Sequence, residues 1–228
     1  KIISRYLSSY TPYDGILLFH YMGTGKTCSS IGTVEKIMNE KNSPYKKVLI
    51  LCKGKSIINN WITEIVEKCT DNKYIPDDFD QIKKWNKKIL ILKKILKKNY
   101  EFHTFHSFVK KIQNYNSRIL NQMYNNSIII IDEIHNIKRD NEKYKPIHNF
   151  LHSIYNKKVI LLSGTPMKDQ PEEISSVLNL ILPKDKQLPV GKTFINMYLN
   201  NIDNIFSIKP EKIQELRQYF TGRISYLK

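Results

Sequence analysis

The chain of 228 residues is 41% hydrophobic and 11% aromatic, which is enough to bury the core of one large α/β domain or two small ones. Its 8 glycines and 9 prolines are too few for collagen, and apolar residues spread along the whole chain exclude a coiled coil and wholesale disorder. Lys and Arg number 37 against 21 Asp and Glu, a net charge of +16 that attracts polyanions, so nucleic acid is the favoured partner.

The first predicted element is a strand over residues 15–19, followed by a glycine-rich loop and a helix from about Thr27. Between them stands His20-Tyr-Met-Gly-Thr-Gly-Lys-Thr27, with His20 where the strict phosphate-loop pattern has Gly. Such a loop points backbone N–H groups at phosphate, helped by the helix N-terminus. We expect Lys26 to reach the β- and γ-phosphates of ATP and Thr27 to ligate Mg²⁺. The residues expected around the nucleotide are Met22, Gly23, Thr24, Gly25, Lys26, Thr27 and Cys28.

Residues 47–52 predict a second buried strand. The apolar spacing after it predicts a helix over residues 56–65, with Ser56 as its N-cap. Further along, residues 81–98 place apolar side chains at alternating spacings of three and four, with eight lysines on the other face. This pattern predicts a basic amphipathic helix. Its lysine face is interpreted as solvated, with contact to nucleic acid or to a membrane surface as the alternatives.

The third predicted strand covers residues 127–131, and its residues 128–131 are one of several aliphatic runs of four residues, the longest in the chain. Such runs are far shorter than the roughly 20 residues of a membrane-spanning helix, so we expect no membrane partner. The strand ends in Asp132 and Glu133, which places two carboxylates at the edge of the sheet where α/β proteins bind ligands. We expect Asp132 to hold Mg²⁺ and Glu133 to orient and deprotonate the attacking water. With Lys26, these are the expected catalytic residues.

A fourth strand, predicted over residues 158–162, runs into Leu161-Leu-Ser-Gly-Thr-Pro166. The hydroxyls of Ser163 and Thr165 can bond the acidic site, and the small side chains let this loop shift with the nucleotide state. A helix is expected from Pro171 to Leu182. Four strands alternating with helices predict a parallel sheet with helices on both faces.

The cysteines, Cys28, Cys52 and Cys69, are odd in number and lack the CxxC spacing. This usage indicates a reducing compartment and no zinc site. We expect all three to be ordinary small core residues.

Gly23-Thr-Gly-Lys-Thr27, Asp132-Glu-Ile-His135 and Ser163-Gly-Thr-Pro166, in this order, resemble motifs I, II and III of the superfamily 2 helicases and translocases. The resemblance covers essentially the whole chain and implies a RecA-like P-loop NTPase lobe. Residues 49–61 resemble motif Ia, especially the Ser…Asn-Trp form of Swi/Snf-type translocases, although that family usually has Pro where this chain has residues 53 and 54. Residues 104–108 occupy the place of motif Ib.

In that family, motifs Ia and Ib hold the phosphate backbone of one strand without reading its sequence. The resemblance therefore implies nucleic-acid contacts, with DNA favoured, from Lys53, Lys55, Ser56, Thr104 and His106. The His that ends motif II links the nucleotide site to the motif III loop in the family. The residues expected to couple the two are His135, Ser163 and Thr165.

The segments 11–13, 19–27, 132–136 and 222–227 are also similar to the large-DNA-virus branch, namely poxvirus nucleoside triphosphatase I and the small subunit of the viral early transcription factor. A lysine count of 32 against 5 arginines, and no alanine, agree with an AT-rich genome. This likeness implies a role in transcription, with a viral RNA polymerase or transcription factor subunit as partner. It also implies a location in the virion and host cytoplasm; outside viruses we expect an intracellular protein.

ATP in this family lies between two RecA-like lobes, and the second lobe supplies the arginine fingers. We assign residues 1–220 to the first lobe, with the basic helical insertion near 81–98, and residues 221–228 to the start of a linker to a second lobe that this chain lacks. An arginine finger contributes about 10³ to 10⁵ in rate. We therefore expect this chain by itself to bind ATP and to hydrolyse it poorly. Because it opens at Lys1 rather than Met, we also expect it to be a piece of a longer protein.

Three other functions compete with a DNA-dependent ATPase motor. A replication or repair helicase, acting on DNA or RNA, would share the same lobe. A non-hydrolysing nucleotide- and DNA-binding assembly subunit would not need both Lys26 and Glu133. A small-molecule kinase is disfavoured by the loop at Ser163 and by the segment that ends at Trp61.

Overall fold

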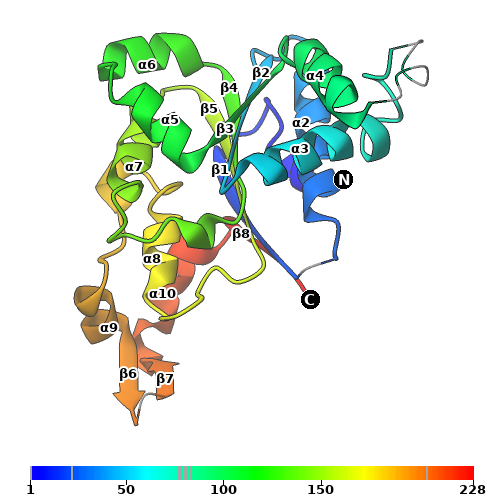
Figure 1. Cartoon of the computed structure of the whole chain (residues 1–228). Helices are drawn as coiled ribbons and strands as arrows, with labels where there is room; N and C mark the ends of the chain where they lie inside the picture. Colours follow the sequence, from blue (N-terminus) through cyan, green and yellow to red (C-terminus); the bar gives the residue numbers. More distant parts are fainter. Residues whose placement is uncertain (1, 22, 77–78, 80–81, 83, 204) are drawn as a thin grey trace.

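The computed structural model describes residues 2–21, 23–76, 79, 82, 84–203 and 205–228. Met22, expected at the nucleotide, and residues 81 and 83, expected in the basic helix, lie outside these ranges. The described part is built around one twisted sheet with helices on both of its faces (Figure 1).

Six strands form this sheet in the order β3-β2-β4-β5-β1-β8, and every adjacent pair is parallel. A separate antiparallel hairpin, β6-β7, projects from one end of the molecule (Figure 1). The strands are β1 (Gly15–His20), β2 (Lys47–Cys52), β3 (Tyr100–Thr104), β4 (Ser127–Ile131), β5 (Lys157–Ser163), β6 (Leu199–Ile202), β7 (Ile205–Ile208) and β8 (Ile224–Leu227).

Helices cover the sheet and connect its parallel strands. None of the helices within the described ranges is long and apolar enough to cross a membrane. The α-helices are α1 (Ile2–Tyr6), α2 (Lys26–Asn39), α3 (Lys55–Thr63), α4 (Trp85–Leu96), α5 (Phe105–Ile112), α6 (Ser117–Tyr124), α7 (Tyr144–Ser153), α8 (Glu173–Leu178), α9 (Lys192–Tyr198) and α10 (Ile213–Phe220). Short 3₁₀ or π turns are η1 (Glu64–Lys68), η3 (Ile134–Asn136), η4 (Lys184–Lys186) and η5 (Pro210–Lys212).

Two apolar cores lie on opposite faces of the sheet, because side chains along a strand alternate between its faces. Leu49 and Leu51 of β2 join α5, α7 and α8 in one core, and Val48 and Ile50 join α2, α3 and α4 in the other. All five residues of β4 are buried, as a central strand covered on both faces requires. The fold predicted from the alternation of strands and helices, an α/β parallel sheet covered on both faces, is confirmed.

The four predicted strands are present as β1, β2, β4 and β5. Several boundaries differ from the prediction. Helix α3 begins at Lys55, and its N-cap is Gly54, two residues before the expected Ser56. Helix α8 ends at Leu178 rather than Leu182, because the Asn179 side chain exchanges two hydrogen bonds with the backbone of Leu188, each 2.8 Å long.

The sequence patterns did not predict β3, β8 or the hairpin. β3 is a short edge strand with only its first residue, Tyr100, fully buried, so it lacks the apolar run of a central strand. β8 pairs with β1 from Leu17↔Ile224 to His20↔Leu227. Residues 224–227, assigned above to the start of a linker, are therefore the last strand of this sheet.

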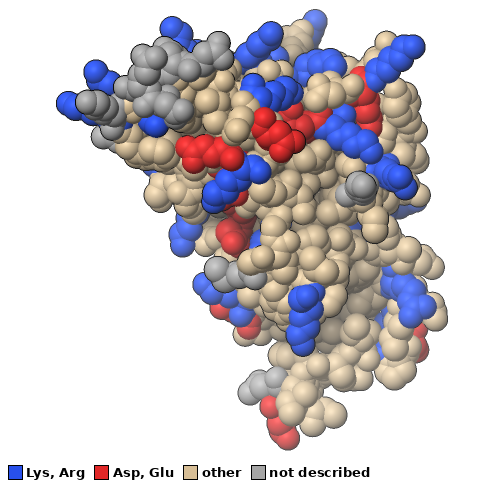
Figure 2. Space-filling model, turned by 90° about the vertical axis from the view of Figure 1, so that its right-hand side faces the viewer, with Lys and Arg blue, Asp and Glu red and all other residues tan. Residues whose placement is uncertain are grey.

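The described part of the basic segment 81–98 contains α4, which turns Ile89, Leu92 and Leu96 into the core. Lys and Arg are scattered over the face of the molecule shown in Figure 2, with acidic side chains among them. Positive charge is thus spread over this face, and the net charge alone does not mark a binding surface.

Candidate nucleotide-binding site

The three sequence motifs follow three neighbouring strands, β1, β5 and β4, and so meet at one edge of the sheet. β5 lies between the other two, in register with Phe19 of β1 at Ser163 and with Ile131 of β4 at Leu161. Because parallel strands point the same way, the loops after all three emerge at their carboxyl ends. The three motif loops are therefore close together in space, although they lie far apart in the sequence.

The loop before α2 has the backbone that a phosphate cradle needs. Gly23 and Gly25 adopt φ values of 81° and 74°, a region that side-chain-bearing residues enter at a cost. The Lys26 ammonium donates to the carbonyl oxygens of His20, at 2.8 Å, and Tyr21, at 3.2 Å. It therefore lies inside the curve of the loop, where a β- or γ-phosphate is contacted in proteins with this motif.

Side chains beside Lys26 serve the loop in different ways. The Thr24 hydroxyl donates to the Tyr21 carbonyl at 2.6 Å and so closes the turn itself. Thr27 stands in the first turn of α2, next to Lys26, as a metal-ligating hydroxyl requires.

Cys28 departs from the expected role of an ordinary core cysteine. It is only half-buried and forms a disulfide with Cys69, with the two Cα atoms 5.2 Å apart. Both sulfurs lie near Glu64, at 3.9 and 3.8 Å from its Oε2. Cys52 alone behaves as expected, since it is buried and free. The expectation was wrong for the other two because their 41-residue separation concealed that α2 and η1 pack together.

Asp132 and Glu133 form the acidic turn after β4. The Asp132 side chain is held in place by Trp61 of α3. The indole N–H of Trp61 donates to Asp132 Oδ2 at 2.8 Å, and the Asp132 N–H donates to the Leu51 carbonyl. Burial raises the pKa of the Asp132 carboxyl, while Trp61 and the charge of Lys26 act in the opposite direction. A carboxylate that burial disfavours is stabilised by a nearby cation.

Glu133 occupies a left-handed backbone conformation, φ 49° and ψ 55°, which is uncommon outside glycine. Strained residues of this kind cluster at functional sites. The turn aims Glu133 Oε2 at His135 Nδ1, 3.2 Å away.

His135 connects the acidic turn with the loop after β5. Its Nδ1 lies 3.0 Å from Ser163 Oγ, and the same hydroxyl oxygen accepts the N–H of Thr165 at 3.0 Å. Asn136 Nδ2 approaches His135 Nε2 at 3.2 Å, so the network assigns the ring proton to Nδ1. Burial lowers the pKa of His135, and Lys168 and Lys53 lower it further, which keeps the imidazole neutral. Thr165 itself is exposed, and its backbone rather than its hydroxyl carries this contact.

The donor set fits Mg²⁺. This hard cation takes oxygen ligands and usually keeps several waters, with one or two carboxylates and substrate phosphates completing its shell. The Thr27 hydroxyl and the Asp132 carboxylate are such oxygens, supplied from two motif loops at the same sheet edge. Lys26 is close enough to act on the pKa of Asp132, as expected for groups around one phosphate.

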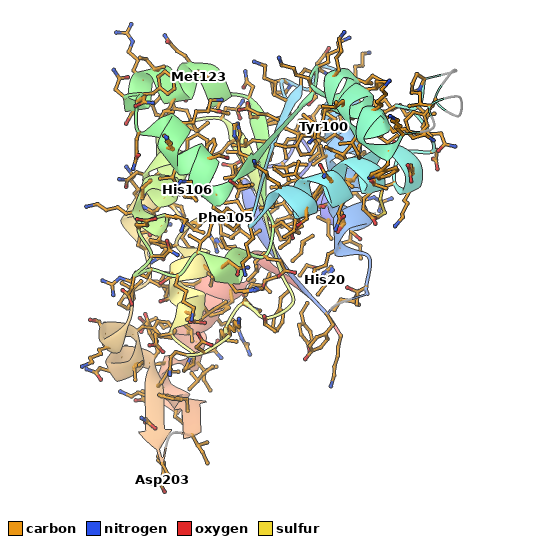
Figure 3. All side chains as sticks on the ribbon, in the orientation of Figure 1. His20, Tyr100, Phe105, His106, Met123 and Asp203 are labelled. Carbon is orange, nitrogen blue, oxygen red and sulfur yellow. A yellow bond between two sulfur atoms is a disulfide. The ribbon has the colours of Figure 1, made fainter. Side chains whose placement is uncertain are left out.

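His20, which replaces the expected glycine, turns away from the phosphate loop. Its Nε2 lies 2.9 Å from Ser225 Oγ on β8, and its Nδ1 is buried with no partner among the described residues. Figure 3 shows His20 at the lower end of β1, beside the C-terminal strand. The His20 side chain therefore does not occupy the phosphate loop. It connects the end of β1 to β8 instead.

The expected nucleic-acid contacts lie at the carboxyl ends of β2 and β3, which pair with Cys52 opposite Thr104. Four of them are exposed: Lys53, Lys55, Ser56 and His106. The Thr104 hydroxyl caps α5 by accepting the Ser107 N–H at 3.2 Å, so its position also has a structural explanation.

The family model described as "SNF2-related domain" matches residues 5–221, a span that contains every motif named above. The chain belongs to the SNF2-related family. Its relatives include a protein of Invertebrate iridescent virus 3 named as a helicase, 087L, which is 39% identical over 195 residues, covering 80% of this chain and 20% of the relative. The early transcription factor 70 kDa subunit of Myxoma virus is 29% identical over 224 residues, 93% of this chain and 29% of the relative. This SNF2-related chain thus spans a fifth to about a third of these relatives.

Two solved structures share the fold of the SNF2-related chain. The Sulfolobus solfataricus SWI2/SNF2 ATPase core in complex with dsDNA has a TM-score of 0.61 and 20% identity, over 93% of this chain and 40% of that one. The Pyrococcus furiosus Hef helicase domain has a TM-score of 0.54 and 15% identity, over 88% of this chain and 39% of that one. The expected RecA-like fold and the superfamily 2 resemblance are both confirmed.

Sequence reasoning missed several contacts of this SNF2-related site. Trp61 was noted within motif Ia, but nothing local tied it to Asp132. His20 was seen only as a departure from a pattern, and its partner Ser225 lies at the other end of the chain. The signal available for Trp61 was its large apolar side chain with a single donor, which usually finds a partner when buried.

Proposed function

We propose that this chain is the first RecA-like lobe of a nucleic-acid-stimulated ATPase motor of a large DNA virus, with ATP and Mg²⁺ as its ligands. The observation that carries the proposal is the convergence of the loops after β1, β4 and β5 at one sheet edge. These loops bring together an ammonium, a hydroxyl and two carboxylates, the groups that phosphoryl transfer to water requires.

Each residue has a distinct role. The N–H groups from Gly23 to Thr27 bind phosphate oxygens, together with the N-terminus of α2. The Lys26 ammonium, now bonded to loop carbonyls, moves to the β- and γ-phosphates. Thr27 and Asp132 hold Mg²⁺, which when bound neutralises charge that develops on the phosphates.

Glu133 orients the attacking water and accepts its proton on a carboxylate oxygen. Its left-handed backbone presents that carboxylate at the end of β4. His135, neutral and bonded between Glu133 and Ser163, transmits the state of the acidic site to the loop at Thr165. Because that loop follows β5 directly, a change at the nucleotide alters its position relative to the rest of the lobe.

We assign nucleic-acid contact, with DNA favoured, to Lys53, Lys55, Ser56 and His106, and with less structural support to Thr104. Their exposure at the ends of β2 and β3 supports binding to a phosphate backbone, which positions a strand without reading sequence. The Sulfolobus solfataricus ATPase core, whose structure is a complex with dsDNA, supports the same class of ligand.

A transcription role, with a viral RNA polymerase or transcription factor subunit as partner, is supported by the name of the Myxoma virus relative. Because β8 belongs to the same sheet as the motif strands, residues 1–227 are proposed as the ATP-binding lobe, extending the span of 1–220 expected from the sequence, and the connection to a second lobe is proposed to follow β8. The second lobe would supply the arginine that speeds hydrolysis by about 10³ to 10⁵. Viral relatives support a place in the virion and host cytoplasm.

The test is steady-state ATPase activity of this chain and of a longer protein that carries it with a second lobe, each with and without DNA. Glu133→Gln is the control that removes the base and keeps the shape of the side chain. We expect slow turnover by the chain alone, and turnover by the longer protein that DNA stimulates and Glu133→Gln abolishes.

If neither protein hydrolyses ATP under any condition, the motor is wrong and a nucleotide-binding assembly subunit takes its place. Strand unwinding measured beside triplex displacement then separates a helicase from a duplex translocase. RNA in place of DNA in the same assays tests the nucleic acid.

A further inference from the structure

A cavity of about 970 Å³ runs along β3, the outer strand of the sheet, away from the three motif loops. Helices α3 and α4 border it on one face of the sheet, and α5 and α6 border it on the other. Figure 3 labels two of its lining residues, Tyr100 on β3 and Met123 on α6. The cavity spans the whole strand, since its lining runs from Asn99 to Thr104.

The backbone of β3 leaves hydrogen-bonding groups on this outer side. Asn99 gives its carbonyl to the Val48 N–H of β2 at 2.7 Å. Since successive residues of a strand point their N–H and C=O groups to alternate sides, those of Tyr100 and Phe102 face away from β2. Within the described sheet no strand lies beyond β3, so this edge can accept one more strand.

Positive charge surrounds this edge. Five exposed lysines line the cavity and make no ion pair with a described residue: Lys47, Lys55, Lys93, Lys97 and Lys98. The acidic residue of the lining, Glu101, is already engaged by Lys111 at 2.6 Å and by His103 at 2.6 Å. Burial would raise the pKa of Glu101, but these partners hold it at about 2.

Apolar surface lies between the lysines. Ile58, Phe102 and Met123 are half-buried in the lining and offer hydrophobic contact on both faces of the strand. Side chains of an added strand would point alternately to the two faces, so each face needs its own contacts. The α3–α4 face supplies lysines with Ile58, and the α5–α6 face supplies Lys111 with Met123.

We propose that this groove is a docking site for an acidic, extended peptide segment of a partner protein, which adds to β3 as a further strand. Main-chain hydrogen bonds to Tyr100 and Phe102 align the peptide with β3, and the lysines favour acidic side chains in the peptide. β3 has five residues, so the groove accommodates about 17 Å of strand at about 3.3 Å per residue.

Two other occupants fit less well. A second copy of this chain carries a net charge of +16, and lysines beside an edge strand oppose pairing between such copies. Lys55 and Thr104, proposed above as nucleic-acid contacts, line the groove only at its end, where β3 stops. A nucleic-acid strand held by the ends of β2 and β3 would cross the strands there, whereas the groove runs along β3. A phosphodiester backbone can accept hydrogen bonds from N–H groups, but DNA's backbone has no donor for the outward C=O groups of Tyr100 and Phe102.

The test uses fluorescence anisotropy of the 228-residue chain with a labelled peptide of four Glu-Val repeats. We expect it to bind at least about tenfold more tightly than a peptide of four Lys-Val repeats, because charge complementarity governs selection. N-methylation of alternate peptide nitrogens should weaken binding about tenfold, because it removes main-chain donors. Hydrogen exchange at the amides of Tyr100 and Phe102 should slow when the acidic peptide binds.

A matched pair of double variants locates the site. Lys97→Glu with Lys98→Glu should weaken binding of the acidic peptide about tenfold. Lys184→Glu with Lys186→Glu makes the same change of charge on the exposed η4 turn, outside the groove, and should leave the affinity within about twofold.

The proposal is overturned if N-methylation has no effect or if both double variants weaken binding equally, because then only net charge is sensed. It is also overturned if a single-stranded oligothymidylate, but not the acidic peptide, binds in a manner that depends on Lys97 and Lys98. In that case the groove serves nucleic acid.

Discussion

The indole N–H of Trp61 donates to the Asp132 carboxylate at 2.8 Å, across 71 residues of sequence. Trp61 is 2% exposed and belongs to α3, the helix that follows the basic loop after β2. Asp132 directly follows the neighbouring strand, β4. One hydrogen bond thus joins the proposed nucleic-acid side of the lobe to its proposed Mg²⁺ ligand.

Replacing Trp61 with Phe removes that donor and leaves a buried carboxylate oxygen short of a partner. We expect a loss of about 1–3 kcal/mol in the free energy of unfolding, measured by urea denaturation. The pKa of Asp132 should rise further, because Trp61 lowers it, so a fluorescent ATP analogue should need more Mg²⁺ for half-saturation. Trp85→Phe is the control, since Trp85 is 51% exposed; equal losses in both variants would contradict the role of the hydrogen bond.

Replacing His135 with Ala removes the side chain that contacts both Glu133 and Ser163 and leaves the residues of the phosphate loop unchanged. In a longer protein that hydrolyses ATP, we expect the KM for ATP to stay within about threefold, while stimulation by DNA falls at least about tenfold. Ser163→Ala should show the same pattern more weakly, because it removes the partner of His135 Nδ1. Loss of ATP binding in either variant would place these residues in nucleotide binding instead of coupling.

The disulfide between Cys28 and Cys69 should be detectable by thiol titration of the unfolded chain. Of the three cysteines, we expect one to react after isolation under oxidising conditions and all three after reduction. Because the bridge closes a loop with a sequence separation of 41, its loss in Cys69→Ser should lower the free energy of unfolding by about 2–4 kcal/mol. The matched comparison is the reduced wild-type chain, which should resemble Cys69→Ser; three reactive thiols in the oxidised chain would refute the pairing.

Stability should fall with acidification in a window set by His152. Burial, with smaller effects of His148, Lys157 and Lys184, lowers the pKa of His152 from 6.5 to about 4, against a hydrogen bond to the Asn179 carbonyl. Between pH 6.5 and about 4, His152 is protonated in the unfolded chain but not in the folded chain. The free energy of unfolding is therefore unaffected by this group above pH 6.5 and decreases as the pH falls toward 4.

His152→Gln removes this titration and keeps a donor for Asn179. The urea midpoint of the variant should therefore change less between pH 7 and pH 4.5 than that of the wild type. His106→Gln, a change at an exposed position, should retain the full dependence. If His152→Gln retains it as well, another group causes the loss.

The sequence contained enough local information to predict the central strands and the phosphate loop. The strand Ser127–Ile131 is continuously apolar because both of its faces are covered, and the glycines before Lys26 are needed for positive φ. β3 and the hairpin β6-β7 were missed because strands with half-buried or exposed residues carry a mixed pattern that resembles a loop. Likewise, residues 224–227 are recognisable as a strand only when β1 is known to have a free edge.

By itself, then, the sequence identified the residues that we propose bear the chemistry, because a phosphate loop, an acidic strand end and a small-residue loop are each encoded within a few neighbouring residues. Tertiary structure alone decided which of them touch. Trp61 meets Asp132, Cys28 meets Cys69 and His20 meets Ser225 only because the order β3-β2-β4-β5-β1-β8 places distant segments side by side. The same order places β3 at the edge of the sheet. An edge position cannot be read from the local sequence, because it depends on which strands pair in the folded chain.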